Sequence, residues 1–219
     1  MTAGPGLLIT FEGVDKAGKT TQVRRLAAFL RDMGIDPVIT REPGGTPLAE
    51  ELRRLVVSGS EDQEMLPLTE TLLLAAARAE HVAQVLLPAL AQGRIVLCDR
   101  FIDSTVAYQG YGLGVDMELI HRLNRLTTQE RFPDLTFLLD VSPTEAAARG
   151  NAGANDRIER RDGDFHSRVR RGFLAEAAQS RNRDRVVVVD GAAAEEAVAR
   201  RIQETLLSRF GTLLKGDSR

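Results

Sequence analysis

The segment that most constrains the fold of this chain is the octapeptide GVDKAGKT at residues 13–20. Its spacing, Gly-x-x-x-x-Gly-Lys-Thr, forms a phosphate-binding loop where a strand ends and a helix begins. The apolar run at residues 7–11 predicts that strand, and apolar residues at helical spacing over 23–33 predict that helix. Glycines let backbone N–H groups point inward at an anion, and the helix N-terminus adds partial positive charge. The sequence therefore predicts a nucleotide-phosphate site at residues 13–20.

The rest of the chain alternates short apolar runs with longer amphipathic segments. Strands are predicted at 7–11, 37–40, 95–98, 135–141 and 186–189. Helices are predicted at 19–33, from Pro47 to Val56, at 68–92 with a kink at Pro88, at 117–126, after the N-cap Ser142, and at 194–210. This alternation is typical of a parallel sheet covered by helices on both faces. We expect a single three-layer α/β domain over residues 1–219, with ligands at the carboxyl ends of five parallel strands.

Composition restricts the class of protein further. The chain has 29 Lys and Arg against 31 Asp and Glu, a net charge of -2, which gives no general electrostatic reason to bind nucleic acid. The single cysteine, Cys98, and the three histidines show no zinc-ligand spacing. The longest apolar stretch, 72–77, is far shorter than the roughly 20 residues that cross a membrane. We expect a cytoplasmic protein that contacts neither a membrane nor nucleic acid.

Loops of this kind serve kinases, GTPases and motor ATPases, so the phosphate site leaves the class of enzyme open. A guanine-specific switch usually carries Asn-Lys-x-Asp, and none of the three lysines follows an asparagine. A kinase must hold a second, anionic substrate, and Arg suits a phosphate because its planar fork donates two parallel hydrogen bonds. Arg41 and Arg100 follow predicted strands, and Asp99 is placed to hold Mg²⁺. A kinase is favoured, and a nucleotide-dependent switch stays as the alternative.

Five segments in order resemble the thymidylate kinase family: ITFEGVDKAGKTTQ, TREPGGTPLAEELR, LLLAAARAEH, LCDRFIDSTVAYQGYG and DRIERR. They cover roughly residues 7–173. The resemblance implies the fold of P-loop NTPases, with a mobile lid at about residues 149–165 inside the arginine-rich segment 149–185. It implies transfer of the γ-phosphoryl group of ATP to dTMP with Mg²⁺, by a homodimer. A kinase for another nucleoside monophosphate remains the second reading.

The resemblance also implies roles for individual residues. ATP is expected to contact Gly13, Val14, Asp15, Lys16, Ala17, Gly18, Lys19, Thr20 and Thr21. The residues expected to contact dTMP are Asp15, Glu42, Pro43, Arg53, Leu74, Arg78, Arg100, Ser104, Thr105, Tyr108 and Gln109. Thr20, Asp99 and Glu42 are expected to order Mg²⁺ and its waters. Catalysis is assigned to Asp15, Lys16, Lys19 and Arg100, and the lid arginines are Arg149, Arg157 and Arg160.

Within the acceptor site the implied contacts are specific. Arg53 and Arg100 would bind the dTMP phosphate. Arg78 would reach the thymine carbonyl, and Thr105 and Gln109 would hydrogen-bond the base. Tyr108 would occupy the space that a ribose 2'-hydroxyl needs. The three histidines are assigned no role.

The chain departs from the family pattern at two places. Leu74 stands where members commonly have a phenylalanine that stacks on thymine, so an apolar contact is expected to replace stacking. The start of the lid, residues 149–154, carries one arginine where some members have several. Lys16, in the phosphate loop, is expected to supply the missing positive charge.

Overall fold

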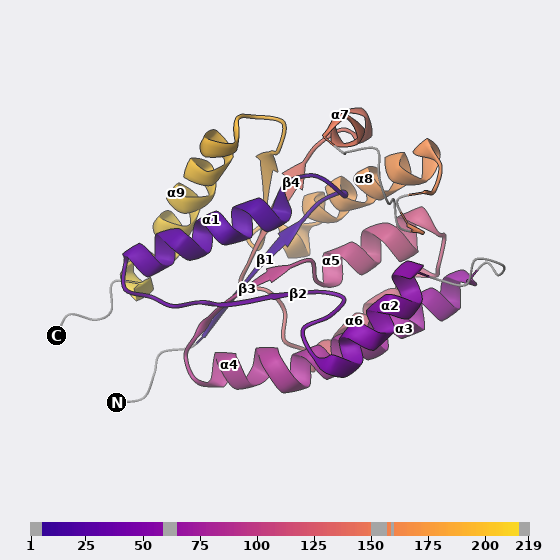
Figure 1. Cartoon of the computed structure of the whole chain (residues 1–219), viewed down its shortest axis with the longest axis horizontal. Coiled ribbons are helices and arrows are strands. Elements are labelled where there is room, and N and C mark those ends of the chain that lie inside the picture. The colour runs from indigo at the N-terminus through magenta and orange to yellow at the C-terminus, as the bar shows by residue number, and fades with distance from the viewer. Residues whose placement is uncertain (1–5, 59–64, 150–156, 159, 215–219) are drawn as a thin grey trace.

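A five-stranded parallel sheet lies at the centre of the molecule, which is described here by a computed structural model of residues 6–58, 65–149, 157–158 and 160–214 (Figure 1). The strands are β1 (Leu7–Glu12), β2 (Val38–Arg41), β3 (Ile95–Asp99), β4 (Leu135–Asp140) and β5 (Val186–Asp190). Their order in the sheet is β2-β3-β1-β4-β5. All five predicted strands are confirmed, with bounds that differ by one residue. The central strand β1 is buried along its whole length, as a strand covered on both faces must be.

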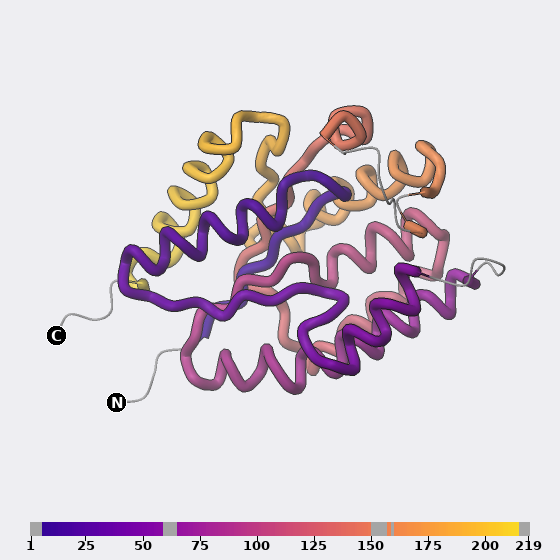
Figure 2. Tube along the Cα trace, viewed as in Figure 1, coloured from indigo at the N-terminus to yellow at the C-terminus, as the bar shows by residue number. Residues whose placement is uncertain are grey.

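Helices cover both faces of this sheet. The α-helices in the described ranges are α1 (Lys19–Asp32), α2 (Pro47–Ser58), α3 (Pro67–His81), α4 (Leu87–Ala91), α5 (Ile102–Thr105), α6 (Met117–Thr128), α7 (Pro143–Ala148), α8 (Gly163–Ala178) and α9 (Glu195–Leu214). Two π-helical segments, η1 (Val82–Leu86) and η2 (Val106–Gly112), and the 3-10 turn η3 (Ser180–Asn182) join them. Figure 2 shows the traces of α1 and α9 running side by side along the sheet.

Alternate residues of β1 supply the two halves of the core. Ile9 and Phe11 pack into the larger apolar cluster, to which α1 contributes Leu26. Leu8 points the other way and packs with Leu86 and Phe101, from η1 and the turn after β3. Because successive side chains of β1 point to opposite faces of the sheet, the strand packs against both helical layers and holds the phosphate loop between them.

Local signals in the sequence place most helix ends correctly. Thr46 Oγ1 accepts a hydrogen bond from the Ala49 amide at 3.2 Å and so caps α2, which begins at Pro47. Ser142 and Glu145 form the reciprocal capping box expected at the start of α7. The predicted helix at 68–92 is three consecutive segments, α3, η1 and α4.

The π-helical segment η1 ends at Leu86, directly before α4, and Pro88 is the second residue of α4. Proline lacks an N–H and its ring crowds the preceding turn, which explains why the α-helical bonding pattern gives way there. Residues Pro67–Ala91 are long and apolar enough to cross a membrane by length and composition alone, a property that core helices of soluble proteins share. In this fold the segment packs against α2, α6 and β3.

Two helical regions were not predicted. One is the run from α5 through η2, residues 102–112, and the other is α8. α8 occupies much of the arginine-rich segment 149–185, and its Phe165, Val169 and Phe173 are buried in the main core, so this part of the segment is a core helix, while the lid expected at about 149–165 stays a prediction. These three residues recur every four positions, a helical spacing that the surrounding arginines obscured. The lid expected at about 149–165 therefore overlaps the first turn of a core helix, and residues 150–156 and 159 lie outside the described part of the chain.

The buried position of α8 predicts the effect of a core truncation. Phe173→Ala is expected to lower the free energy of unfolding by about 3–5 kcal/mol, since the ring is 3% exposed and its removal leaves a cavity. Urea denaturation measures this. Arg171→Ala, at an exposed position of the same helix, is the matched control and should cost less than about 0.5 kcal/mol. A small effect of both substitutions would contradict the assignment of α8 to the core.

Candidate active site

The phosphate loop forms as the sequence predicts, between β1 and α1. Gly13, Lys16 and Gly18 have positive φ angles of 137°, 62° and 94°. A Cβ on Gly13 would lie 2.5 Å from the Leu139 carbonyl oxygen, so only glycine fits there. These left-handed residues curl the backbone around the space in front of α1, which is the arrangement that binds an anion.

Lys19 is held over this loop. Its Nζ donates to the carbonyl oxygens of Gly13 and Val14 at 3.1 and 2.7 Å. Burial, and then the charge of Arg100, lower the pKa of Lys19 to about 8, against the opposing effects of Asp15 and Asp99. The ammonium group therefore lies at the centre of a compact set of charges, beside the position that the loop creates for a phosphate.

Thr20 and Asp99 meet in space although 79 residues separate them. Thr20 Oγ1 donates to Asp99 Oδ2 at 2.5 Å, because α1 starts beside the carboxyl end of β3. No group of three His, Cys, Asp or Glu in the described ranges could hold a metal ion by itself. One hydroxyl and one carboxylate nevertheless suit Mg²⁺, which is usually bound through few protein oxygens together with waters and substrate phosphates. The donor set therefore fits Mg²⁺ that arrives with ATP.

Glu42 has different partners. Its Oε2 accepts from Arg78 Nε at 2.7 Å, and its Oε1 lies 2.9 Å from His81 Nδ1. His81, to which the sequence assigned nothing, is fully buried and also contacts Thr40 Oγ1 at 2.7 Å. A role for Glu42 in ordering Mg²⁺ stays a prediction, whereas its pairing with Arg78 and His81 is observed.

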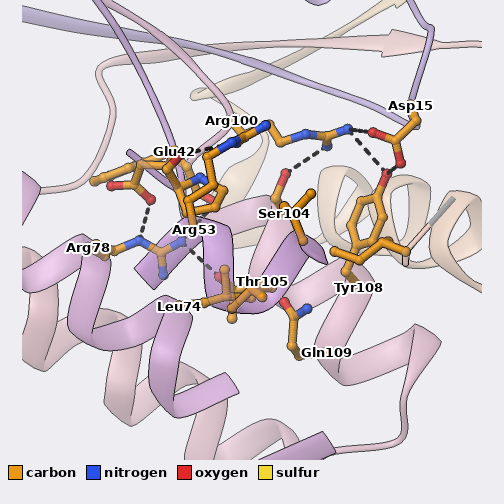
Figure 3. Close-up of a pocket in the computed structure, with 15 residues that line it drawn as sticks. Asp15, Glu42, Arg53, Leu74, Arg78, Arg100, Ser104, Thr105, Tyr108 and Gln109 are labelled. Carbon is orange, nitrogen blue, oxygen red and sulfur yellow. Dashed lines mark hydrogen bonds and ion pairs between the residues drawn. The ribbon is translucent and has the colours of Figure 1, made fainter. Parts of the chain in front are cut away.

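A cavity beside the phosphate loop brings together the acceptor residues named from the sequence (Figure 3). All eleven of them line it: Asp15, Glu42, Pro43, Arg53, Leu74, Arg78, Arg100, Ser104, Thr105, Tyr108 and Gln109. Sequence reasoning missed four further lining residues, which are Val56, Val57, Phe101 and Ile158. Of these, Val56 belongs to the apolar face of the helix predicted from Pro47 to Val56, and Val57 lies in the same helix, which continues to Ser58.

Arg100 joins this cavity to the phosphate loop. Its Nη2 donates to Asp15 Oδ1 at 2.5 Å, and its Nη1 donates to the Gly13 carbonyl at 2.9 Å. The Tyr108 hydroxyl donates to Asp15 Oδ2 at 2.8 Å, and the Arg100 guanidinium lies 5.0 Å from the centroid of the Tyr108 ring. Burial opposes ionisation of Asp15, but Arg100, Lys19 and the Tyr108 hydroxyl lower its pKa below the ordinary value.

Arg78 is equally well fixed at the other end of the cavity. It is 4% exposed, and besides Glu42 it donates to Asn124 Oδ1 at 2.7 Å and Thr105 Oγ1 at 2.8 Å. A fourth bond reaches the Phe101 carbonyl at 3.2 Å. Asn124, which no motif indicated, comes from α6. The guanidinium is thus oriented by four partners from three separate segments of the chain before any ligand arrives.

Glu12 is a buried carboxylate that sequence reasoning did not consider. It accepts from the Phe101 amide at 2.8 Å and from the amide and hydroxyl of Ser104 at 3.3 and 2.5 Å. These bonds shape the turn that carries Arg100, whose φ of 69° is left-handed. Burial, and then the charge of Asp103, raise the pKa of Glu12 to about 8. The signal was present in the sequence, since Glu12 directly extends the run at residues 7–11, which was predicted to be a fully buried strand.

The predicted lid arginines lie in different places. Arg149 donates to the Gly191 carbonyl at 2.7 Å and borders a second cavity that Lys16, Gly18 and Gly191 also line. Arg157 instead contacts the end of α2, where its Nε donates to the Val56 carbonyl at 2.9 Å. Arg160 is exposed. The expected replacement of lid charge by Lys16 stays a prediction.

The raised pKa of Glu12 predicts a pH-dependent stability. A carboxylate with a folded pKa above its unfolded value stabilises the fold at low pH and loses that contribution as pH rises toward 8. The stability of Glu12→Gln relative to the parent protein should therefore improve between pH 5 and pH 8. Urea denaturation at both values measures it, with the exposed Glu118→Gln as control. A relative stability that does not change with pH would contradict the burial of an ionisable Glu12.

Comparison with known proteins agrees with this geometry. A family model described as thymidylate kinase matches residues 11–202. The thymidylate kinase of Geobacter sulfurreducens is 48% identical over 93% of this chain and 98% of its own length, and that of Pelotomaculum thermopropionicum is 47% identical over 98% and 99%. The crystal structure of thymidylate kinase from Ehrlichia chaffeensis superimposes with a TM-score of 0.74 at 36% identity, over 93% of this chain and 100% of that one. The phosphate loop, the adjoining cavity and these likenesses together show that the chain belongs to the thymidylate kinase family.

Proposed function

We propose that this protein transfers the γ-phosphoryl group of ATP to dTMP, which gives dTDP and ADP. The observation that carries the proposal is the continuous cavity that begins at Asp15 and Arg100, beside the phosphate loop, and ends at Arg78, Thr105 and Gln109. One end is suited to a phosphate and the other to a polar base edge. Membership of the thymidylate kinase family supports the same substrate pair.

On the donor side, the loop amides and Lys19 bind the ATP phosphates. Thr20 and Asp99 hold Mg²⁺, which when bound neutralises charge on the phosphate oxygens. The second cavity, bordered by Gly18, Arg149 and Gly191, takes the remainder of ATP. This division puts the γ-phosphate at the end of the loop that faces Arg100.

On the acceptor side, Arg53 and Arg100 bind the dTMP phosphate. Phosphoryl transfer passes through a loose transition state, so the protein mainly holds two anions in line and neutralises spreading charge. Fixed guanidinium groups do this with little reorganisation. The ionised Asp15 then accepts from the sugar 3'-hydroxyl, and Lys16 adds positive charge on the donor side.

Tyr108 is the residue that favours a deoxyribose. Its hydroxyl is bonded to Asp15, and its ring is held edge-on by Phe165 and Phe173, with centroids 6.1 and 6.0 Å away. A ring fixed on three sides cannot move aside for a 2'-hydroxyl. Leu74 supplies an apolar surface for the base in place of a stacking ring.

We also infer a cytoplasmic homodimer. Adjacent helices α2, α3 and α6 expose Leu55, Leu72 and Leu126, which are 57%, 47% and 74% exposed. A second copy that covers these three side chains would bury apolar surface on both chains. Light scattering at micromolar concentration should give twice the mass of one chain, and the mass of a monomer would exclude the dimer.

The decisive experiment is the initial rate of ADP formation from MgATP with no acceptor and with dTMP, dUMP, UMP, CMP, AMP or GMP. Strong stimulation by dTMP, well above dUMP, is expected. Greater stimulation by another nucleotide would keep the fold and the type of chemistry but replace the acceptor. Binding of ATP with no increase in ADP formation by any acceptor would favour the alternative function, a nucleotide-dependent switch.

Removal of one phosphate-binding arginine tests the acceptor assignment. Arg53→Ala should raise KM for dTMP by about 10- to 100-fold, because a charge-assisted hydrogen bond to the phosphate is lost, while KM for ATP changes little. Steady-state kinetics measure both constants. Arg54→Ala is the matched control, since Arg54 is exposed and pairs with Glu51. An equal effect of both variants would contradict a phosphate role for Arg53.

A further inference from the structure

Glu70 is a buried carboxylate behind Gln109, a residue that lines the acceptor cavity, and the reaction described above does not use it. It lies in α3 and is fully buried. Its Oε1 accepts from Gln109 Nε2 at 2.9 Å. Its Oε2 accepts from Arg157 Nη2 at 2.5 Å and from Arg161 Nη2 at 2.7 Å. One carboxylate thus joins α3, the π-helical segment η2 and the residues that precede α8.

The two arginines keep this carboxylate ionised. Burial alone raises the pKa of Glu70, but the hydrogen bonds from Arg161 and Arg157, with that from Gln109, lower it below the ordinary value. An ionised carboxylate accepts hydrogen bonds and has no hydrogen to donate. Gln109 must therefore present its NH₂ group, and not its carbonyl oxygen, to Glu70.

This constraint decides what Gln109 presents to the cavity. The NH₂ group and the carbonyl oxygen lie on opposite sides of the amide, so fixing one fixes the other. In Figure 3 the Gln109 oxygen is turned toward Thr105 and Leu74, and the nitrogen points away from them. Among the described residues, Gln22 Oε1 is the fully buried side-chain atom that lacks a hydrogen bond. The Gln109 oxygen is not such an atom, so it is not an unpaired atom inside the core and is accessible from the cavity.

We propose that Glu70 is a positioning residue that holds the Gln109 amide with its carbonyl oxygen facing the base, so that the site selects a pyrimidine with a hydrogen on N3. The inference rests on the proposed function and extends it to base recognition. Thymine and uracil carry an N3–H, which donates to this oxygen. Cytosine has a lone pair at N3, which would face the oxygen unpaired.

Glu70→Gln tests the proposal because it keeps the shape of the side chain and removes the constraint. A Gln at this position either donates or accepts, so the Gln109 amide is free to turn its NH₂ group toward the cavity. The ratio of kcat/KM for dTMP to that for dCMP should fall about tenfold, equivalent to about 1.4 kcal/mol. Arg78 still faces the base, so the preference should weaken and not reverse.

Three further variants distinguish a change in the orientation of the Gln109 amide from a general loss of activity or stability. Glu70→Asp keeps the charge and should retain most of the ratio. Arg161→Gln removes one arginine from Glu70 but leaves the bond to Gln109, and it should leave the ratio within about twofold, whatever its overall rate. In a Gln109→Leu background, Glu70→Gln should produce no additional change in the ratio, because the amide through which Glu70 acts is absent.

The outcomes distinguish this inference from the proposed function. A parent protein that does not prefer dTMP over dCMP would overturn the base site itself. A parent that prefers dTMP, with the same ratio in Glu70→Gln, would overturn only the role of Glu70. If Glu70→Gln does not unfold cooperatively, the variant is not properly folded and its kinetics do not test the proposal. A crystal structure of the parent protein with dTMP then tests the role of Glu70. A Gln109 amide between Glu70 and thymine N3 supports the proposal, and an amide that has left either partner excludes it.

Discussion

The ion pair between Asp15 and Arg100 is the interaction on which the arrangement of this site depends. It joins the loop after β1 to the turn after β3, and these two segments bring the donor and acceptor positions together. The Arg100 and Asp15 side chains are 17% and 30% exposed, and removing two charges from water even in part is costly unless their remaining hydrogen-bonding groups are satisfied. Here the Gly13 carbonyl, the Ser104 hydroxyl and the Tyr108 hydroxyl complete the set. The pair is therefore a fixed part of the scaffold that also carries charge to the reacting phosphates.

Buried acidic side chains support the polar residues of the cavity in the same way. Glu42 orients Arg78, Glu12 shapes the turn that holds Arg100, and Glu70 restrains Gln109. Each carboxylate accepts at least two hydrogen bonds, so loss of one partner leaves a desolvated charge or dipole. These three buried acidic residues explain how a site made of long, flexible side chains is held in one geometry before substrates bind.

Much of the fold was predictable because its signals are local. The strand at 7–11, the glycine-rich loop and the caps at Thr46 and Ser142 each depend on a few neighbouring residues, and each is confirmed. α8 was missed because Phe165, Val169 and Phe173, its buried apolar side chains in the core, are spread among arginines and acids, so that their burial is visible only once Tyr108 and the sheet are beside them. The acceptor residues were named through family resemblance, and the structure gathers all of them around one cavity.

By itself the sequence determined the class of fold and the phosphate loop, since these follow from spacing along the chain, and its resemblance to a family named most of the cavity residues. Only the tertiary structure decided the partners of the buried charges. The contacts of Glu70 with Arg157, 87 residues away, and of Glu42 with Arg78 leave no trace in local pattern. A hydrogen bond depends on distances of about 3 Å and on orientation, and only packing of the sheet and its helices sets these between residues remote in sequence.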